Sequence, residues 1–170
     1  MIENKMFCFQ CQETAKGTGC TIKGVCGKEA ETSKWQDLLL SVVRGVGTIQ
    51  HELGETASNE VANFLIDAMF STITNANFDD QSILNKVDTG IALKKQLLEK
   101  ASTKNIILPD YQEVCWGGEK SDYSAEGERE GVLRNENADL RSLKELTILG
   151  LKGIAAYYDH AGRLGNTSEE

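Results

Sequence analysis

The chain has 170 residues, of which 40% are hydrophobic and 26% charged, and its formal net charge is -8 at pH 7. This composition is ordinary for a globular protein and excludes a largely disordered chain. The acidic balance argues against nucleic acid and anionic membranes as partners, because both attract clustered Lys and Arg. No apolar run reaches the roughly 18 to 20 residues of a membrane span, and no signal peptide is evident, so we predict a cytoplasmic protein.

The N-terminal segment holds four of the five cysteines. Cys8 and Cys11 form a CxxC pair, Cys20 follows after eight intervening residues, and Cys26 follows after five more. In a reducing compartment, such a dense group binds metal more often than it forms disulfides. A CxxC turn directs two sulfurs to one side, and glycine-rich returns bring back the others. We therefore expect four thiolates to share one metal site.

This cysteine spacing is compatible with an iron–sulfur cluster, a structural zinc site or two disulfides. Zinc sites more often combine two CxxC pairs, whereas only one pair is tight here. Four-thiolate ligation itself fits either metal. Glycines flank the cysteines and favour a cluster, because they let backbone N–H groups approach and donate to sulfur; these are Gly17, Gly19, Gly24 and Gly27. Apolar neighbours are expected to shield the site or anchor the segment: Met6, Phe7, Phe9, Ile22 and Val25.

Three amphipathic helices are expected after the cysteine segment. The first runs from an N-cap at Ser33 to about Leu53, because apolar residues recur there at intervals of three and four. Gly45 and Gly47 lie inside it and indicate a close packing neighbour. The second is expected over residues 58–75 and the third over residues 79–101. Amphipathic helices joined by short polar links are typical of an up-and-down bundle.

The remaining sequence has a weak region followed by one strong helix. Residues 103–137 lack clear periodicity, and such a long connection should contain short helical turns, around Glu126–Arg134. The last helix is expected over Ala138–Gly162 with Asp139 as its N-cap. Because no segment alternates with the period of a strand, we predict an all-α fold. We divide the chain into a cysteine-rich segment (1–30), a helical bundle (31–102), an irregular connection (103–137) and a C-terminal helix and tail (138–170).

The other candidate residues have simpler interpretations, and we predict no catalytic residue. Cys115 stands beside Trp116 without a histidine near it in the sequence, which is more typical of a packing residue than of a nucleophile. His51 and His160 are expected on or near helix surfaces, and neither belongs to an HxxxH or ExxH pair. The sequence also lacks GxGxxG, P-loop and GxSxG motifs.

Three stretches resemble the N-terminal region of the hybrid-cluster proteins, also called prismane proteins and often described as hydroxylamine reductases. They are Met6–Lys28, Leu38–Leu40 and Leu149–Gly165. The cysteine spacing resembles the short-spacing class of that family, which holds a [4Fe–4S] cluster, whereas a longer-spacing class holds [2Fe–2S]. The resemblance implies a helical domain of two three-helix-bundle halves. It also implies four cluster ligands: Cys8, Cys11, Cys20 and Cys26.

The same resemblance implies an electron-transfer role. In that family the N-terminal cluster feeds a mixed oxo–sulfido iron cluster where hydroxylamine or nitric oxide would be reduced, and the ligands of the second cluster belong to later domains. This sequence stops at Glu170 before those ligands, so we expect it to move electrons without reducing hydroxylamine. Expected partners are an electron-donating redox protein and the missing hybrid-cluster domains. Zinc and [2Fe–2S] remain alternative cofactors, and a zinc-binding interaction module is the alternative function.

Overall fold

A computed structural model describes residues 6–165, so residues 1–5 and 166–170 of the predicted segments lie outside the described part. Within residues 6–165 the regular structure is helical and includes no strand, which confirms the all-α class. The helices are α1 (Ala30–Glu52), α2 (Asn59–Ser71), α3 (Asp80–Thr103), α4 (Gln112–Cys115), α5 (Tyr123–Arg129) and α6 (Ala138–Arg163), with short 3-10 turns η1 (Ala15–Gly17), η2 (Lys120–Asp122) and η3 (Val132–Arg134). None of the helices in this range is both long and apolar enough to cross a bilayer.

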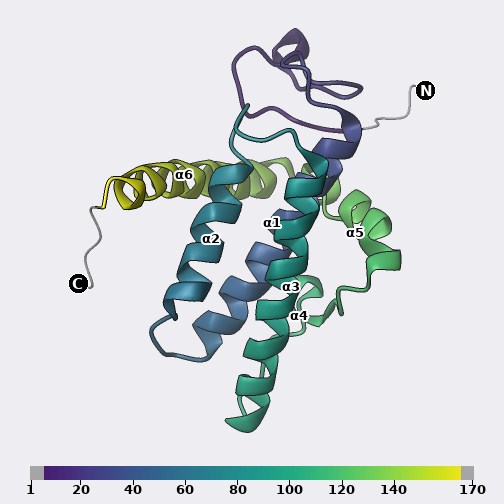
Figure 1. Cartoon of the computed structure of the whole chain (residues 1–170). Coiled ribbons are helices and arrows are strands. Elements are labelled where there is room, and N and C mark those ends of the chain that lie inside the picture. Colours follow the sequence, from purple (N-terminus) through teal and green to yellow (C-terminus); the bar gives the residue numbers. More distant parts are fainter. Residues whose placement is uncertain (1–5, 166–170) are drawn as a thin grey trace.

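Helices α1, α2 and α3 form an up-and-down bundle (Figure 1). The apolar stripes expected from the sequence meet in its centre. The apolar side chains completely removed from solvent there are Leu38, Leu39, Val46, Ile49, Ala68, Ile83 and Val87. Burying one such Leu, Ile or Val side chain contributes about 1.5–3 kcal/mol to folding. The bundle is therefore a rigid support for the segments that pack on it. The four-part division of the chain stays a prediction.

The starts of α2 and α3 agree with the sequence, but the start of α1 does not. Ser58 accepts a hydrogen bond from the Val61 amide, and Asp79 accepts from the amides that follow it. Helix α1 begins at Ala30 after an extended Glu29, three residues before the predicted cap at Ser33. The Ser33 amide already donates to the Glu29 carbonyl, so this serine lies inside the first turn and is buried.

Two other helix ends differ from their predicted positions. Helix α2 ends at Ser71 instead of Asn75, because the hydroxyls of Ser71 and Thr72 donate back to carbonyls three residues earlier. Asn75 has a positive φ of 63°, which is incompatible with a continuing helix. Helix α6 is capped by Asn137, whose side chain accepts from two following amides, and the predicted cap Asp139 lies in its first turn. Several neighbouring side chains can cap the same helix end, so the sequence places such ends only to within a few residues.

The irregular connection packs against the bundle through short helices, as expected. The helical turn predicted over Glu126–Arg134 is divided into α5 and η3. A Cβ atom added to Gly45 would clash with the Glu113 carbonyl oxygen of α4, which explains the glycine. The same prediction is wrong for Gly47, where no atom lies within 4 Å. The buried Lys94 completes this contact by donating to the carbonyls of Glu113 and Trp116.

Helix α6 crosses the end of the bundle that carries the cysteine segment (Figure 1). It packs on α2, yet among its described residues only Lys152 and Ala155 are buried. Large apolar side chains on its other face are exposed: Leu140, Leu143, Leu146, Leu151, Ile154, Tyr157 and Tyr158. The described residues thus contain one three-helix bundle, and α6 has an unpartnered apolar face in place of the second bundle implied by the family resemblance.

Candidate metal centre

The cysteine segment folds over the end of the α1–α3 bundle (Figure 1). The amide of Cys8 donates to the Cys20 carbonyl at 3.1 Å, and the amide of Cys20 donates back at 2.8 Å. This reciprocal pair is an isolated antiparallel bridge. It closes the loop that contains Cys11 and η1. The bridge therefore holds two cysteines that are twelve positions apart side by side.

Two glycines are required where the segment turns back, as the sequence predicted. Gly19 has a φ of 141°, and a Cβ atom there would lie 2.7 Å from the Phe7 ring. A Cβ atom on Gly24 would lie 3.0 Å from the Cys26 sulfur and from the Lys28 Cβ. A side chain at either position would push against the segment that carries the thiols. The backbone approach is thus specific to glycine.

The structure brings all four predicted ligands around one small cavity of about 10 Å³, which Gly24, Lys28 and Asn75 also line. Cys20 is buried, Cys8 and Cys11 are half-buried and Cys26 is exposed, and all four are free thiols. Within residues 6–165, no three Cys, His, Asp or Glu side chains converge closely enough to hold a single ion. In a [4Fe–4S] cluster each thiolate binds a different iron, so the sulfurs surround a volume instead of a point. Four free thiols supply that donor set, and they must move apart to admit a cluster because a space of about 10 Å³ holds about one water.

The surroundings of Cys20 favour its thiolate form. Burial by itself would raise the pKa of this thiol, but hydrogen bonds from the amides of Ala15 and Val25 oppose that effect. The Thr14 hydroxyl and the charge of Lys28 act in the same direction, so the pKa of Cys20 lies below its usual value. The Ala15 amide donates to the sulfur at 3.5 Å. Because the thiolate is the metal-binding form of cysteine, these donors prepare Cys20 for a metal.

Lys28 places a positive charge beside the site. Its side chain is only 2% exposed, and its Nζ lies 3.8 Å from the Cys8 sulfur. The same ammonium donates to Gln36 Oε1 at 2.6 Å, and the Gln36 amide donates to the Asn77 carbonyl. This chain of contacts connects the cysteine segment to α1 and to the loop before α3. Lys28 is therefore both a tether and a charge partner for sulfur.

The expected apolar shield is only partly present. Met6 is buried, and the rings of Phe7 and Phe9 pack with their centroids 5.4 Å apart. Ile22 and Val25 are 53% and 61% exposed, so for these two residues the shielding prediction is wrong. They lie on the outer side of a loop that has no second layer of described residues over it. The thiols are thus covered from the bundle side and more open on the side of Cys26.

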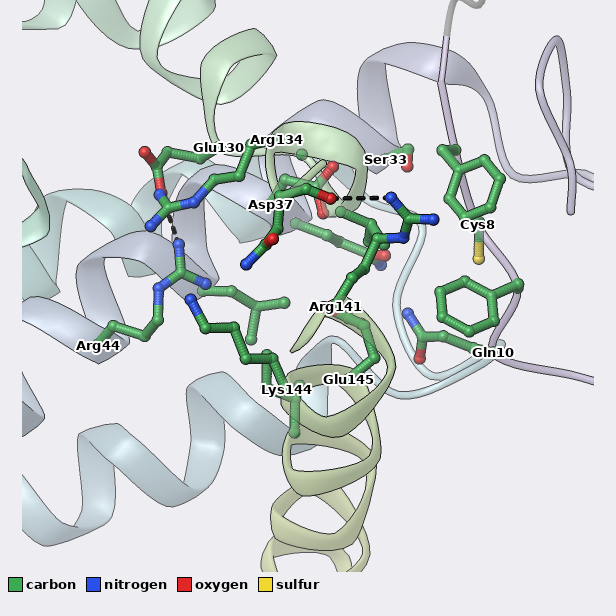
Figure 2. A pocket seen from close by; sticks show the side chains of 18 of the residues that line it. Cys8, Gln10, Ser33, Asp37, Arg44, Glu130, Arg134, Arg141, Lys144 and Glu145 are labelled. Atoms are coloured by element: carbon green, nitrogen blue, oxygen red, sulfur yellow. Dashed lines mark hydrogen bonds and ion pairs between the residues drawn. The ribbon is translucent and has the colours of Figure 1, made fainter. Parts of the chain in front are cut away.

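A larger cavity of about 420 Å³ lies on the inner side of Cys8, between the cysteine segment, α1 and α6. Figure 2 shows Cys8 and Gln10 at one edge, with Arg44, Glu130 and Arg134 at the opposite edge. Arg44 binds Glu130 at 2.6 Å, and Arg134 also pairs with this buried carboxylate. Sequence reasoning missed this cavity because its charged residues come from separate elements. The available signal was the charged side of α6, opposite its leucines.

Asp37 and Lys152 are the cavity's most perturbed titratable groups. Burial raises the pKa of Asp37 to about 7, although the charges of Lys152 and Lys28 oppose the shift. Burial lowers the pKa of Lys152 to about 8, and the charge of Lys28 acts in the same direction. Lys152 is 2% exposed and donates to the Thr72 carbonyl at 3.0 Å and to Gln10 Oε1 at 3.3 Å. It thereby connects α6 to the CxxC turn.

Residues judged secondary in the sequence lie away from the four thiols. Cys115 is exposed, so its interpretation as a packing residue is wrong. Its hydrogen bond to Asp110 at 3.2 Å, assisted by burial, raises the pKa of the thiol, which disfavours a nucleophilic role. His51 is exposed on α1. His160 is also exposed and contacts the edge of the Phe70 ring, with centroids 5.8 Å apart, which agrees with the predicted surface positions.

Comparison with known proteins identifies related sequences. The model of the Prismane/CO dehydrogenase family matches residues 6–170. A hydroxylamine reductase of Bacteroides thetaiotaomicron is 49% identical over 167 residues, which are 97% of this chain and 30% of that protein. A hydroxylamine reductase of Porphyromonas gingivalis is 45% identical over 99% of this chain and 32% of its own. A hydroxylamine reductase of Nitratidesulfovibrio vulgaris is 43% identical over 94% of this chain and 31% of its own. The chain thus spans about a third of the length of these relatives.

Proposed function

The chain belongs to the Prismane/CO dehydrogenase family, and from this premise we propose that it is an electron-transfer unit with a [4Fe–4S] cluster. The observation that carries the proposal is that Cys8, Cys11, Cys20 and Cys26 line one cavity. The relatives are hydroxylamine reductases, so an oxidoreductase setting supports a redox metal over a structural one. When bound, the cluster supplies reversible one-electron transfer.

The protein contributes ligation, hydrogen bonds and charge to this function. The four thiolates bind the irons, while the Ala15 amide and the Thr14 hydroxyl hold the sulfur of Cys20. Lys28 lies beside Cys8 and offsets negative charge there. Cys26 is the exposed ligand. We propose that an electron-donating redox protein of the cytoplasm approaches on this side, where the path through protein is shortest.

Anaerobic reconstitution tests the cluster assignment. The purified chain should bind about four iron and four sulfide, absorb broadly near about 400 nm and give the EPR signal of a reduced cubane. Replacing any of the four cysteines by Ser should impair loading. Cys115→Ser is the matched control and should load normally. A colourless chain with one zinc would contradict the proposal in favour of a structural zinc module, and two iron per chain would indicate [2Fe–2S].

We further propose that the reducing centre for hydroxylamine or nitric oxide lies in the two thirds of the relatives' length that this chain does not span. The present chain would then supply electrons to that centre. The reconstituted chain should accept electrons from a reduced dye without consuming hydroxylamine. Oxidation of the dye that depends on hydroxylamine, with this chain alone, would contradict the division of roles and indicate a complete enzyme, formed for example by self-association.

The outer, apolar face of α6 is a candidate docking surface for the part of the relatives that this chain does not span. At 3.6 residues per turn, the exposed Leu143, Ile154 and Tyr157 fall on one side of the helix and the buried Lys152 falls on the opposite side. A contiguous apolar face on a folded protein marks an interaction surface. We propose that it packs against the remaining portion of a hydroxylamine reductase polypeptide, because the relatives contain such a portion and this chain does not span it.

Co-purification with a separately expressed remainder of the Bacteroides thetaiotaomicron relative tests this docking surface. The wild-type chain should bind that fragment, and a Leu146→Glu, Ile154→Glu double variant should not. Lys144→Glu, an exposed change on the same helix, should leave binding intact. If the wild-type chain instead binds itself and not the fragment, and the double variant loses that self-association, the proposed occupant is contradicted. The face would then be a contact between copies of this chain.

A further inference from the structure

Two buried lysines from distant parts of the sequence lie on the inner side of the cysteine segment. Lys28 Nζ is 3.8 Å from the Cys8 sulfur. Lys152 Nζ is 3.3 Å from Oε1 of Gln10, which stands between the two cysteines of the CxxC pair. Each side chain is 2% exposed. The proposed cluster would thus have two ammonium groups on its protein side.

Neither lysine has its charge cancelled by a direct ion pair within residues 6–165. Lys28 donates to the neutral amide of Gln36, and Lys152 donates to the neutral carbonyl of Thr72. Fully buried lysines are rare unless they are paired, because removing an ammonium from water is costly. A negatively charged group nearby lowers that cost. The charges of Asp37, Glu145 and Cys8 act on Lys152 in this direction. For Lys28 the Cys8 sulfur, 3.8 Å from its Nζ, is such a group once it is a thiolate.

We propose that Lys28 and Lys152 set the reduction potential of the cluster by stabilising its reduced state, and that Asp37 opposes them. This inference rests on the proposed [4Fe–4S] function. Reduction adds one negative charge to the site, and a buried cation attracts that charge more strongly than a cation in water does. The two lysines therefore raise the potential. Loss of either charge shifts the equilibrium towards the oxidised cluster.

Asp37 supplies a charge of opposite sign in the same region. It lines the 420 Å³ cavity together with Cys8, Lys28 and Lys152. Its carboxylate has no hydrogen bond or ion pair to another described residue, and both lysines act on it electrostatically. Because an anion disfavours a further negative charge, Asp37 lowers the potential through its ionised fraction, which is about half at pH 7 because its pKa is about 7. The two signs give a test that a purely structural role of these residues would not satisfy.

The experiment is an anaerobic redox titration of the reconstituted chain at pH 7, followed by EPR of the reduced cluster. Lys152→Met should shift the equilibrium towards the oxidised form by about tenfold, which is about 59 mV for one electron. Lys28→Met should shift it in the same direction, and Asp37→Asn in the opposite direction. Lys152→Arg keeps the charge and should stay near the wild-type potential. Lys144→Met removes an exposed charge from the rim of the same cavity, and solvent screening should keep its effect below about twofold.

The outcomes separate this inference from the proposed function. A wild-type chain that takes up no iron would overturn the proposed function and, with it, this inference. A loaded chain whose potential is the same in Lys152→Met, Lys28→Met and Asp37→Asn would overturn the inference alone. If Lys152→Met fails to load, Asp37→Asn and Lys28→Met still decide the sign. Shifts of one sign in all three variants would also contradict the electrostatic account.

Discussion

The α1–α3 bundle and the cysteine segment, residues 6–28, are held together by different forces. The bundle has a continuous core of apolar side chains from all three helices. In the cysteine segment only Met6 and Cys20 are buried apolar residues. The segment is shaped by the backbone hydrogen bonds between Cys8 and Cys20, by glycine turns and by hydrogen bonds from Lys28 and Lys152. The bundle can therefore fold by hydrophobic burial, whereas the segment depends on local bonds and, as proposed, on its cluster.

This difference separates stability from function within one small protein. Metal binding adds its free energy only to the structure that the metal orders. Changes in the bundle should lower the free energy of unfolding and leave the chemistry of the thiols intact in the folded fraction. Changes in the cysteine segment should affect cluster loading and leave the bundle stable. The four predictions below test this separation.

The largest effect is expected in the bundle core. Leu39→Ala removes a fully buried side chain of α1 and should lower the free energy of unfolding by about 2–5 kcal/mol, because it leaves a cavity. Urea denaturation followed by circular dichroism measures it. Leu143→Ala, on the exposed face of α6, is the control and should change stability by less than about 0.5 kcal/mol. Equal losses in both variants would mean that α6 is part of the same core.

The next largest effect is expected at the two glycines of α1, where replacement by alanine should change the free energy of unfolding in opposite directions. Gly45→Ala places a methyl group against the Glu113 carbonyl and should destabilise by about 1–3 kcal/mol, because α4 must move. Gly47→Ala meets no atom within 4 Å and should stabilise by about 0.5–1 kcal/mol, since alanine is the better helix former. Thermal unfolding distinguishes them. A stable Gly45→Ala variant would show that the packing of α4 against α1 yields easily.

A smaller effect is expected in the dependence of stability on pH. The pKa of Asp37 is raised to about 7, above the roughly 3.9 of an unfolded chain. Between these values the folded state binds more protons than the unfolded state, so this carboxyl makes stability fall as pH rises towards 7. Asp37→Asn should therefore lose less stability between pH 5 and pH 8 than the wild type. Urea titrations at both values measure it, and an unchanged pH dependence would contradict the raised pKa of this half-buried carboxyl.

The smallest effect on the bundle, with a clear effect on the metal site, is expected from Gly24→Ala. The added methyl group would lie 3.0 Å from the Cys26 sulfur and should reduce iron content after reconstitution. The bundle should unfold at an unchanged denaturant concentration in the metal-free chain. Iron analysis and circular dichroism on the same sample measure both quantities. A parallel loss of bundle stability would show that the two regions fold as one unit.

The sequence predicted those elements whose physical cause is local. The helix starts at Ser58 and Asp79, the helical periods and the glycines around the cysteines are all properties of neighbouring residues. The position of the first helix start failed, because Ser33 has a good capping side chain that the fold buries inside the turn. The prediction of a close neighbour at Gly47 was also wrong, because the fold places no atom within 4 Å of that position. A glycine shows that space is needed or strain relieved, but only the neighbours show which.

The sequence by itself determined the all-α class and the group of four cysteines, because helical period and cysteine spacing are set along the chain. Only the tertiary structure placed Lys152 beside the CxxC turn, 142 positions away from Gln10. It also decided that α6 turns its charged side towards the thiols and its leucines outward. The buried ammonium of Lys152 depends on acceptor oxygens from Gln10 and Thr72, and that arrangement has no signature in the order of residues.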